Sequence, residues 1–286
     1  MKQKHGLILI NAYSNLPHAL DQAQRIKEEL QALGSQADVR RNNFFPAIVN
    51  DGGTIVRAVN DYDFCVYLDK DKYVSQMLEK TGLRLFNPHA AVQACDDKMT
   101  TSILLAGYMP MPKTIPAPLC YDPQEPVSEE FVSRIEAELG YPVVVKTSYG
   151  SLGKGVFKAE NREELVSLCE KLKCVPHLYQ RFVRESDGKD MRVIVIGGTT
   201  VAAMVRQSDH DFRSNIELGG KGTAITPPRE VQRMCETAAR VLGLDFCGVD
   251  VLFDKDGYSI CEVNSNAFFG GMERVTGVNV AKRYAE

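Results

Sequence analysis

The feature that most constrains this chain is a pair of β-rich runs near its C-terminal end, joined by a charged turn at 254–257 that ends in glycine. Two such runs around a short turn predict a β-hairpin. A three-residue loop with Gly257 in the left-handed conformation is a common connection for such a hairpin. This register sets Asp250 opposite Glu262, and Asn264 shares the face of Glu262 because side chains alternate along a strand.

This predicted hairpin brings two carboxylates and one carboxamide to a single patch between apolar neighbours. Such hard oxygen donors suit Mg²⁺, which also holds nucleotide phosphates. We therefore predict Asp250, Glu262 and Asn264 as metal ligands; the alternative is a pair of solvent-facing acids on an edge hairpin. A calcium loop is excluded because Leu252 stands where that pattern needs an acid.

Composition limits the class of protein. A chain of 286 residues suits two domains or one large one, and a net charge of −3 argues against a general nucleic-acid binder. No apolar run reaches transmembrane length, and the first apolar run reads as a buried strand rather than a signal peptide. The 8 cysteines form no C-x-x-C pair. That usage is typical of reduced thiols, so we expect a cytoplasmic protein that binds neither nucleic acid nor membrane.

The first part of the chain alternates strands with helices. The pattern predicts strands at 7–10, 38–40, 64–68 and 83–86, and helices at 20–33 and 72–80. Strands that alternate with helices imply a parallel sheet covered on both faces. This indicates a Rossmann-like layer, and because no G-x-G-x-x-G occurs, we assign it no dinucleotide.

The rest of the chain divides at a proline-rich link, 116–126. The pattern predicts helices at 96–107, 128–139, 163–172 and 229–242, and strands at 141–146, 156–158, 178–183, 191–196 and 200–206. Together with the metal hairpin, this gives an α/β (α+β) chain. We predict domains at 1–95, 96–183 and 184–286.

A glycine-rich loop at 150–155 combines three glycines with a lysine. Backbone N–H groups in such a loop approach phosphate oxygens closely. Because strands flank it on both sides and no Gly-Lys-Ser/Thr follows, we interpret it as a hairpin flap rather than a Walker A loop. Lys146, at the end of the preceding strand, is placed to reach a phosphate. A plain mobile tip and a snorkelling surface lysine are the alternatives.

Several motifs now stand in a characteristic order. They are Asp97-Lys98, Met111-Pro112-Lys113-Thr114, Lys146, the 150–156 loop, Gln180-Arg181-Phe182-Val183, Asp190-Met191-Arg192, the 211–215 segment and Asp250 with Glu262-Val263-Asn264. The ordered set resembles the ATP-grasp carboxylate–amine ligases, and most closely the RimK family of glutamate ligases. The resemblance covers nearly the whole chain. It implies an ATP-grasp fold preceded by a Rossmann-like pre-ATP-grasp domain.

The resemblance implies a role for each matched position. Lys98 and Lys146 would contact ATP phosphates, residues 180–183 would frame adenine, and Asp190 would accept from the ribose hydroxyls. The nucleotide residues that it implies are Lys98, Lys146, Gly150, Ser151, Gly153, Lys154, Gly155, Gln180, Arg181, Phe182, Val183, Asp190 and Arg213.

The resemblance also implies the catalytic groups. Arg213 and Asn215 would face the γ-phosphate, and Arg192 would join Arg213 in stabilising charge on the phosphoryl group and the tetrahedral intermediate. Asp250, Glu262 and Asn264 would hold two Mg²⁺ (or Mn²⁺) ions, with Glu262 between them. Taken alone, Asp190 with Arg192 would read as an exposed turn, and Arg213 as a surface arginine.

The implied reaction activates a carboxylate with ATP and passes the acyl group to the amine of an amino acid or peptide, glutamate above all. The segment 265–271 departs from the Ser-Pro-Gly-like loop of RimK-type ligases and resembles the lysine-biosynthesis branch, which joins glutamate to a carrier protein. The alternatives are a kinase-like phosphotransferase and a silent nucleotide-binding module. Relatives form dimers or tetramers, so the resemblance also implies a homo-oligomer.

Overall fold

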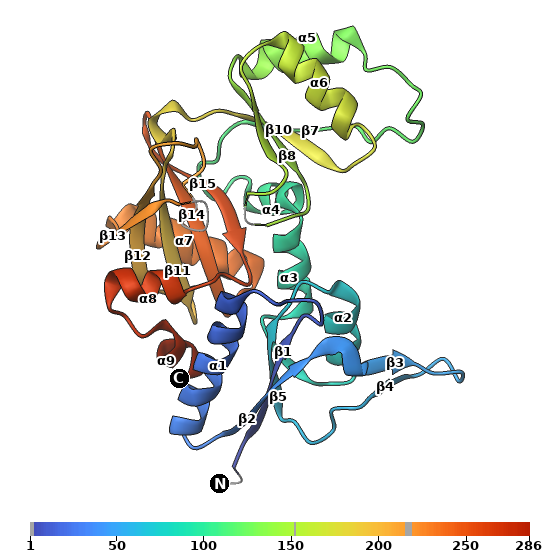
Figure 1. The fold of residues 1–286 in the computed structure, drawn as a ribbon, viewed down its shortest axis with the longest axis vertical. Helices are drawn as coiled ribbons and strands as arrows, with labels where there is room; N and C mark the ends of the chain where they lie inside the picture. The colour runs from blue at the N-terminus through green and yellow to red at the C-terminus, as the bar shows by residue number, and fades with distance from the viewer. Residues whose placement is uncertain (1–2, 152, 215–218) are drawn as a thin grey trace.

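The computed structural model describes residues 3–151, 153–214 and 219–286. Three sheets of four or five strands follow one another along the described chain, and a two-stranded sheet lies within its first part (Figure 1). No helix in these described ranges is long and apolar enough to cross a membrane.

The first sheet has four parallel strands in the order β2-β1-β5-β6. Its elements are β1 (His5–Ile10), α1 (Pro17–Ala32), β2 (Gln36–Arg41), β5 (Phe64–Leu68), α2 (Lys72–Lys80) and β6 (Arg84–Phe86). The predicted parallel sheet is thus confirmed. The pattern missed a short 3-10 turn and a hairpin, β3 (Ala47–Val49) with β4 (Ile55–Arg57), that projects from the sheet in Figure 1.

The helix predicted at 96–107 is confirmed with narrower bounds, and the helix that precedes it was not predicted. The structure has two helices, α3 (His89–Asp96) and α4 (Lys98–Leu105), separated at Asp97. Asp97 is in an extended conformation, and its carboxylate accepts the backbone N–H groups of Met99 and Thr100 at 2.9 and 3.2 Å. An aspartate in that position caps the second helix and so ends the first.

The second sheet is antiparallel, in the order β7-β10-β8-β9, and carries two helices. Its elements are β7 (Thr114–Pro116), α5 (Glu129–Leu139), β8 (Val143–Thr147), β9 (Val156–Ala159), α6 (Arg162–Leu172) and β10 (His177–Arg181). The pairing of β8 with β9 confirms that the glycine-rich loop is a hairpin tip. The sheet and its helices form the upper part of the molecule in Figure 1.

The third sheet is antiparallel, in the order β13-β12-β11-β14-β15. Its elements are β11 (Lys189–Ile196), β12 (Thr199–Gln207), β13 (Lys221–Ala224), α7 (Arg229–Leu242), β14 (Phe246–Asp254), β15 (Gly257–Asn264), α8 (Gly270–Thr276) and α9 (Val280–Ala285). Val193, Val249 and Val263 point to one face and pack on α7 in a buried cluster. Because side chains alternate, the opposite face is free to carry polar groups.

Hydrophobic cores join the first and third sheets. Ile26 of α1 is buried in the same cluster as Phe246 of β14 and Val280 of α9. The side chain of Asn87 is also buried here and holds the chain around Phe246: it accepts the Phe246 N–H at 2.9 Å and donates to the Ser265 carbonyl at 2.8 Å. One of the three larger sheets lies in each of the predicted ranges 1–95, 96–183 and 184–286. The hydrophobic core around Ile26 and Phe246 contains residues of both the first and the last range.

Candidate active site

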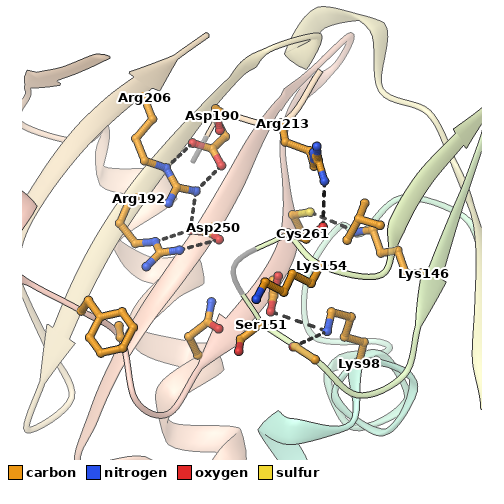
Figure 2. Close-up of a pocket in the computed structure, with 18 of the residues that line it drawn as sticks. Lys98, Lys146, Ser151, Lys154, Asp190, Arg192, Arg206, Arg213, Asp250 and Cys261 are labelled. Carbon is orange, nitrogen blue, oxygen red and sulfur yellow. Dashed lines mark hydrogen bonds and ion pairs between the residues drawn. The ribbon is translucent and has the colours of Figure 1, made fainter. Parts of the chain in front are cut away.

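A cavity of about 320 Å³ lies where the three sheets meet. That volume suits a small molecule. In Figure 2, a chain of arginine and aspartate side chains lines one side and lysines line the other. The wall includes every predicted site residue whose surroundings are described except Gly155: Lys98, Lys146, Gly150, Ser151, Gly153, Lys154, Gln180, Arg181, Phe182, Val183, Asp190, Arg192, Arg213, Asp250, Glu262 and Asn264.

Strand register places the charged groups in rows across the third sheet. Arg192 lies opposite Asp250, and Asp250 lies opposite Glu262. Two residues along β11, Asp190 lies opposite Arg206. Directly opposed residues point to the same face, so these strands deliver both rows to the cavity side.

These side chains form a continuous ion-pair network. The guanidinium of Arg192 donates to both oxygens of Asp250, one of them at 2.8 Å. Arg206 donates to both oxygens of Asp190 and also lies 3.0 Å from Asp250. Arg206 is only 3% exposed. A buried arginine needs such partners, and here one guanidinium links two carboxylates.

The network keeps Asp250 ionised. Burial by itself would raise the pKa of its carboxyl group, but the charges of Arg192 and Arg206 outweigh burial, and the pKa is lowered. Burial likewise opposes the charge on Arg206, and the negative charges of Asp250 and Asp190 raise its pKa instead. The cavity therefore keeps fixed charges of both signs on this wall.

The structure confirms the predicted register of the hairpin but not the predicted length of its turn. Asp250 pairs with Glu262, as predicted. The loop contains two residues rather than three, because Asp254 pairs with Gly257, and an irregularity beside Cys261 then shifts the register by one. Such a bulge keeps Cys261 and Glu262 both on the cavity wall. A sequence pattern does not separate a longer loop from a short loop with a bulge.

Gly248 explains how Arg192 reaches its place. A side chain at 248 would come within 2.5 Å of the Ala267 Cβ and 3.3 Å of the Arg192 side chain. The glycine therefore lets Arg192 lie across β14 toward Asp250.

The predicted metal ligands fit a hard cation in donor type. Asp250 and Glu262 lie in the same row, and the Glu262 side chain is 26% exposed within the cavity. Asn264 also lines the wall. Both oxygens of Asp250 already accept from arginine, so a cation there would share this carboxylate with Arg192 or Arg206. Among the residues that the structure describes, no three His, Cys, Asp or Glu side chains gather as a metal site by themselves.

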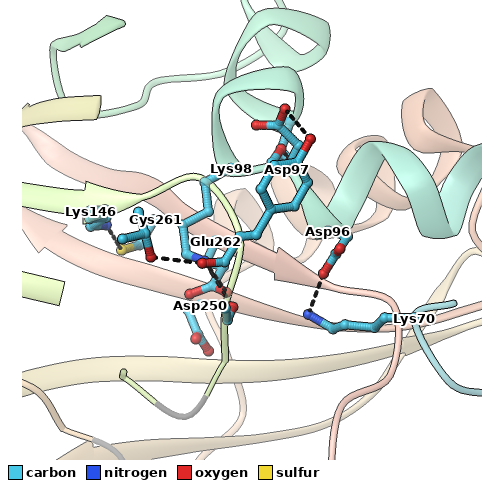
Figure 3. A network of polar contacts seen from close by, with 12 residues as sticks. Lys70, Asp96, Asp97, Lys98, Lys146, Asp250, Cys261 and Glu262 are labelled. Carbon is cyan, nitrogen blue, oxygen red and sulfur yellow. Dashed lines mark hydrogen bonds and ion pairs between the residues drawn. The ribbon is translucent and has the colours of Figure 1, made fainter. Parts of the chain in front are cut away.

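One lysine lies beside Glu262, and a second lies beside the neighbouring residue Cys261 (Figure 3). The Lys98 ammonium lies 4.0 Å from the Glu262 carboxylate and donates to the Gly150 carbonyl at 3.0 Å. Burial lowers the pKa of Lys98, and the charge of Glu262 acts in the opposite direction. Lys146 is 7% exposed and lies 3.4 Å from the Cys261 sulfur. This part of the cavity wall therefore carries two ammonium groups and one carboxylate, and the excess of positive charge favours a further anion.

The flap is held from both sides. Besides the bond from Lys98, Arg213 donates to the Gly153 carbonyl at 2.8 Å. Gly155 has a φ of +78°, and a Cβ there would lie 2.3 Å from the Thr147 hydroxyl. Only glycine fits that backbone without displacing Thr147.

The segment predicted to frame adenine follows β10 and lines the cavity. Arg181 pairs with Asp254 at 2.6 Å, and Gln180 donates to Thr114 at 2.9 Å. The Lys158 ammonium lies 5.2 Å from the centre of the Phe182 ring. These contacts fix the positions of the side chains along the segment.

Some residues with a predicted role already pair with other side chains of the chain. Arg213 pairs with Asp211 at 2.6 Å, which lowers the pKa of that aspartate chiefly through their hydrogen bonds. Both oxygens of Asp190 accept from Arg206, so a bond from a ribose hydroxyl to Asp190 would compete with this pair. Asn215 lies outside the described residues.

Sequence reasoning missed two groups of residues. The first is Arg206, which the opposite register with Asp190 would have indicated once the β11–β12 hairpin was recognised. The second is the N-terminal wall, where Asn11, Ser14 and Gln22 line the cavity. No local motif marks these three, because tertiary packing alone brings α1 to the third sheet.

Comparison with known sequences gives a family match. A model of the RimK-like ATP-grasp domain matches residues 95–286. The chain is 36% identical over 253 residues to human N-acetylaspartylglutamate synthase A, covering 87% of this chain and 61% of that protein. It is 37% identical over 222 residues to zebrafish beta-citrylglutamate synthase B, covering 76% of this chain and 53% of that protein. The chain thus spans only part of the length of these relatives.

Solved structures give the same fold. A RimK-domain ATP-grasp protein from Sphaerobacter thermophilus has a TM-score of 0.72 at 19% identity, covering 98% of both chains. D-alanine–D-alanine ligase from Bacillus anthracis, solved with ATP, has a TM-score of 0.73 at 15% identity, covering 98% of this chain and 94% of that one.

Proposed function

The chain belongs to the RimK-like ATP-grasp family, and from this premise we propose that it is an ATP-dependent ligase that joins a carboxylate to the amine of glutamate. The relatives' names support glutamate, since they include N-acetylaspartylglutamate synthase, beta-citrylglutamate synthase and alpha-L-glutamate ligase.

One observation carries the proposal: Lys98 and Lys146 lie on the cavity wall with Glu262, beneath a glycine-rich flap. Two ammonium groups and a carboxylate under a glycine-rich flap are suited to a polyphosphate with its cation. The proposed nucleotide site extends along the flap to residues 180–183, with the base against the backbone there.

The proposed reaction has two steps. The substrate carboxylate attacks the γ-phosphorus, the bond to the β-phosphate oxygen breaks, and ADP leaves. The amine then attacks the acyl carbon and expels phosphate, with loss of a proton. Phosphorylation is needed because an oxide is a poor leaving group at neutral pH. The protein contributes positioning and charge stabilisation rather than a covalent nucleophile.

Asp250, Glu262 and Asn264 would hold the divalent cation, for which we propose two Mg²⁺ (or Mn²⁺) ions with Glu262 between them. Bound there, Mg²⁺ would neutralise the β- and γ-phosphate oxygens. Arg192 already contacts Asp250 and so lies beside the proposed phosphoryl position. We assign Arg192, Arg213 and Asn215 to stabilising the transferred phosphoryl group and the tetrahedral oxyanion.

The flap would protect the acyl phosphate. Lys98 and Arg213 hold its carbonyl groups from opposite sides. A closed flap excludes water, which would otherwise hydrolyse the activated carboxylate.

The setting of the reaction is also a proposal. All 8 cysteines are free, which supports a reducing compartment such as the cytoplasm. We propose a small molecule or peptide as the carboxylate substrate, with a carrier protein as the alternative. We also propose a homo-oligomer, and this proposal rests on the family resemblance alone.

The test is ADP release by the purified protein with ATP, Mg²⁺, L-glutamate and a panel of carboxylates that includes N-acetylaspartate and citrate. We expect ADP only when both substrates are present, and mass spectrometry should find the amide. ADP released with a carboxylate alone, together with a stable phosphorylated product, would instead indicate a phosphotransferase.

A further inference from the structure

Two cysteines of the second sheet region lie away from the cavity. Cys120 is in the link that follows β7, and Cys174 is in the turn between α6 and β10. Neither is among the residues that line the cavity, and the proposed function uses neither of them. The elements that flank them in the chain, β7, α6 and β10, lie together in the upper part of Figure 1.

Backbone hydrogen bonds bring the two cysteines together. The pairing of β7 with β10 continues past the end of β7, where the Ala117 N–H donates to the His177 carbonyl at 3.1 Å. Further along, the Cys120 N–H donates to the Lys173 carbonyl at 2.8 Å, and Cys174 is the next residue after that acceptor. Neighbouring strands joined by such bonds lie about 5 Å apart. A disulfide needs Cα atoms about 4.4–6.8 Å apart, so the backbone holds the cysteines at a suitable spacing.

The two thiols also act on each other. Desolvation raises the pKa of the Cys174 thiol, and the charge of Cys120 and a side-chain hydrogen bond to it raise that pKa further, while the charge of Lys173 lowers it. The Cys120 thiol donates to the Asp122 carbonyl at 3.0 Å. Cys174 is exposed and Cys120 is half-buried, so a small reagent can reach the pair. A disulfide carries no charge, and its formation would remove the repulsion between the two sulfurs.

Further contacts hold the link beside the end of α6. The Lys173 ammonium donates to the Glu125 carbonyl at 2.6 Å, and the Glu170 carboxylate accepts the Val127 N–H at 2.8 Å. Lys173 and Glu170 also pair with each other at 2.7 Å. Because these bonds fasten the link after Cys120, the two cysteines stay neighbours in the folded chain.

A disulfide suits this pair better than a metal ion does. A zinc site needs further protein ligands besides two thiolates. Within residues 3–151, 153–214 and 219–286, no three His, Cys, Asp or Glu side chains gather so that they could hold an ion. The two thiols therefore lack the additional ligands that a soft cation requires.

The other cysteines are less available for oxidation. The thiolate rather than the thiol is the reactive form. Burial raises the pKa of the remaining six thiols, which are Cys65, Cys95, Cys169, Cys235, Cys247 and Cys261. The first five of these are buried, and Cys261 lies on the cavity wall beside Lys146. The exposed Cys174 is thus the cysteine that a reagent meets first.

We propose that Cys120 and Cys174 are a redox modification site, which closes a disulfide on reaction with a low-molecular-weight disulfide such as oxidised glutathione. The Cys174 thiolate attacks one sulfur of the reagent and expels one glutathione thiolate. The Cys120 thiolate then attacks the Cys174 sulfur and expels the second. Two electrons pass from the cysteines to the reagent, and the two thiol protons end on the released glutathione molecules. Because the bond is accessible, a reducing thiol can open it again.

The bond would join the two ends of the unit that carries the flap. The segment between the cysteines contains α5, the β8–β9 hairpin and α6. A cross-link that closes so long a loop stabilises the fold by restricting the unfolded chain. This effect does not depend on the reaction that the cavity catalyses.

The test incubates the purified chain with oxidised glutathione and maps its thiols by mass spectrometry after alkylation. We expect the loss of two hydrogen atoms, a peptide that joins Cys120 to Cys174, and full reversal by dithiothreitol. Oxidation should raise the melting temperature by about 5 °C. Cys261→Ser is the matched control, because it removes a thiol of the cavity wall and should keep both the cross-linked peptide and the shift.

Variants of the pair test the order of the two steps. Cys120→Ser should retain one glutathione on Cys174 as a stable mixed disulfide, and Cys174→Ser should retain much less, because the exposed thiol is missing. Neither variant should show the rise in melting temperature on oxidation.

Three outcomes would overturn the proposal. The first is a pair that stays reduced at millimolar oxidised glutathione, and the second is glutathione bound to both cysteines without a bond between them. The third is an equal rise in melting temperature in Cys120→Ser. All three are measured without ATP or substrates, so a failed search for ligase activity leaves them unaffected.

Discussion

Arg192 on β11 lies directly opposite Asp250 on β14, and its guanidinium contacts both oxygens of that carboxylate. Asp250 is only 6% exposed. The register of two strands thus places a cation against the first predicted metal ligand. Arg206 adds a second contact from β12 at 3.0 Å, so the carboxylate is positioned before any ligand arrives.

Removing the central cation should destabilise the fold. Arg206→Met leaves Asp190 and Asp250 buried without the guanidinium that links them. We expect the free energy of unfolding in urea to fall by about 3–5 kcal/mol, the cost of uncompensated buried charge. Arg206→Lys keeps the charge and should recover part of the loss. Arg240→Met on the surface of α7 is the control and should change stability by less than about 0.5 kcal/mol.

Stability should depend on pH through Asp250. Its folded pKa is lowered because the two arginines outweigh burial. The carboxylate therefore contributes stability above its unfolded pKa of about 4, and this contribution is lost as the pH falls through the folded pKa. Urea titrations from about pH 6 to pH 3 should show this loss, and Asp250→Asn should flatten it. Asp209→Asn, at an exposed carboxylate, should keep the slope of the unaltered protein.

Activity should depend on Lys146 and Glu262, which both line the cavity. Lys146→Met and Glu262→Gln should each reduce ADP release at least about 100-fold, because the first removes a positive charge from the proposed phosphate site and the second removes a negative charge from the proposed cation site. Thermal melting should show an intact fold in both. Lys221→Met removes a cation that is 83% exposed and serves as the control. Undiminished turnover in either cavity variant would contradict the proposed nucleotide site.

The flap should tolerate no side chain at Gly155. Gly155→Ala places a Cβ 2.3 Å from the Thr147 hydroxyl on a backbone with a φ of +78°. We expect the KM for ATP to rise about tenfold, with about 1–3 kcal/mol lost in stability from strain. Gly198→Ala carries the same strain at a φ of +75° with nothing within 4 Å, so it should lose stability without changing the KM for ATP.

Much of the local structure could be predicted from the sequence. The helix at 72–80, the strand at 64–68 and the helix at 229–242 match the structure at both ends, because each combines a clear hydrophobic period with a cap or turn signal. The pairing of Asp250 with Glu262 was also predictable from alternation around one turn. Asp97 was not recognised as a helix cap, and α3 just before it was not predicted.

The sequence by itself determined most of the longer strands and helices and most of the charged residues on the cavity wall, because these follow from periods of about 2 and 3.6 residues. Only the tertiary structure decided that Arg206 would bridge Asp190 and Asp250, and that Ala19 and Gln22 of α1 would line the cavity. Those contacts join segments up to 244 residues apart. They arise from the packing of separate sheets on shared cores, which no local pattern encodes.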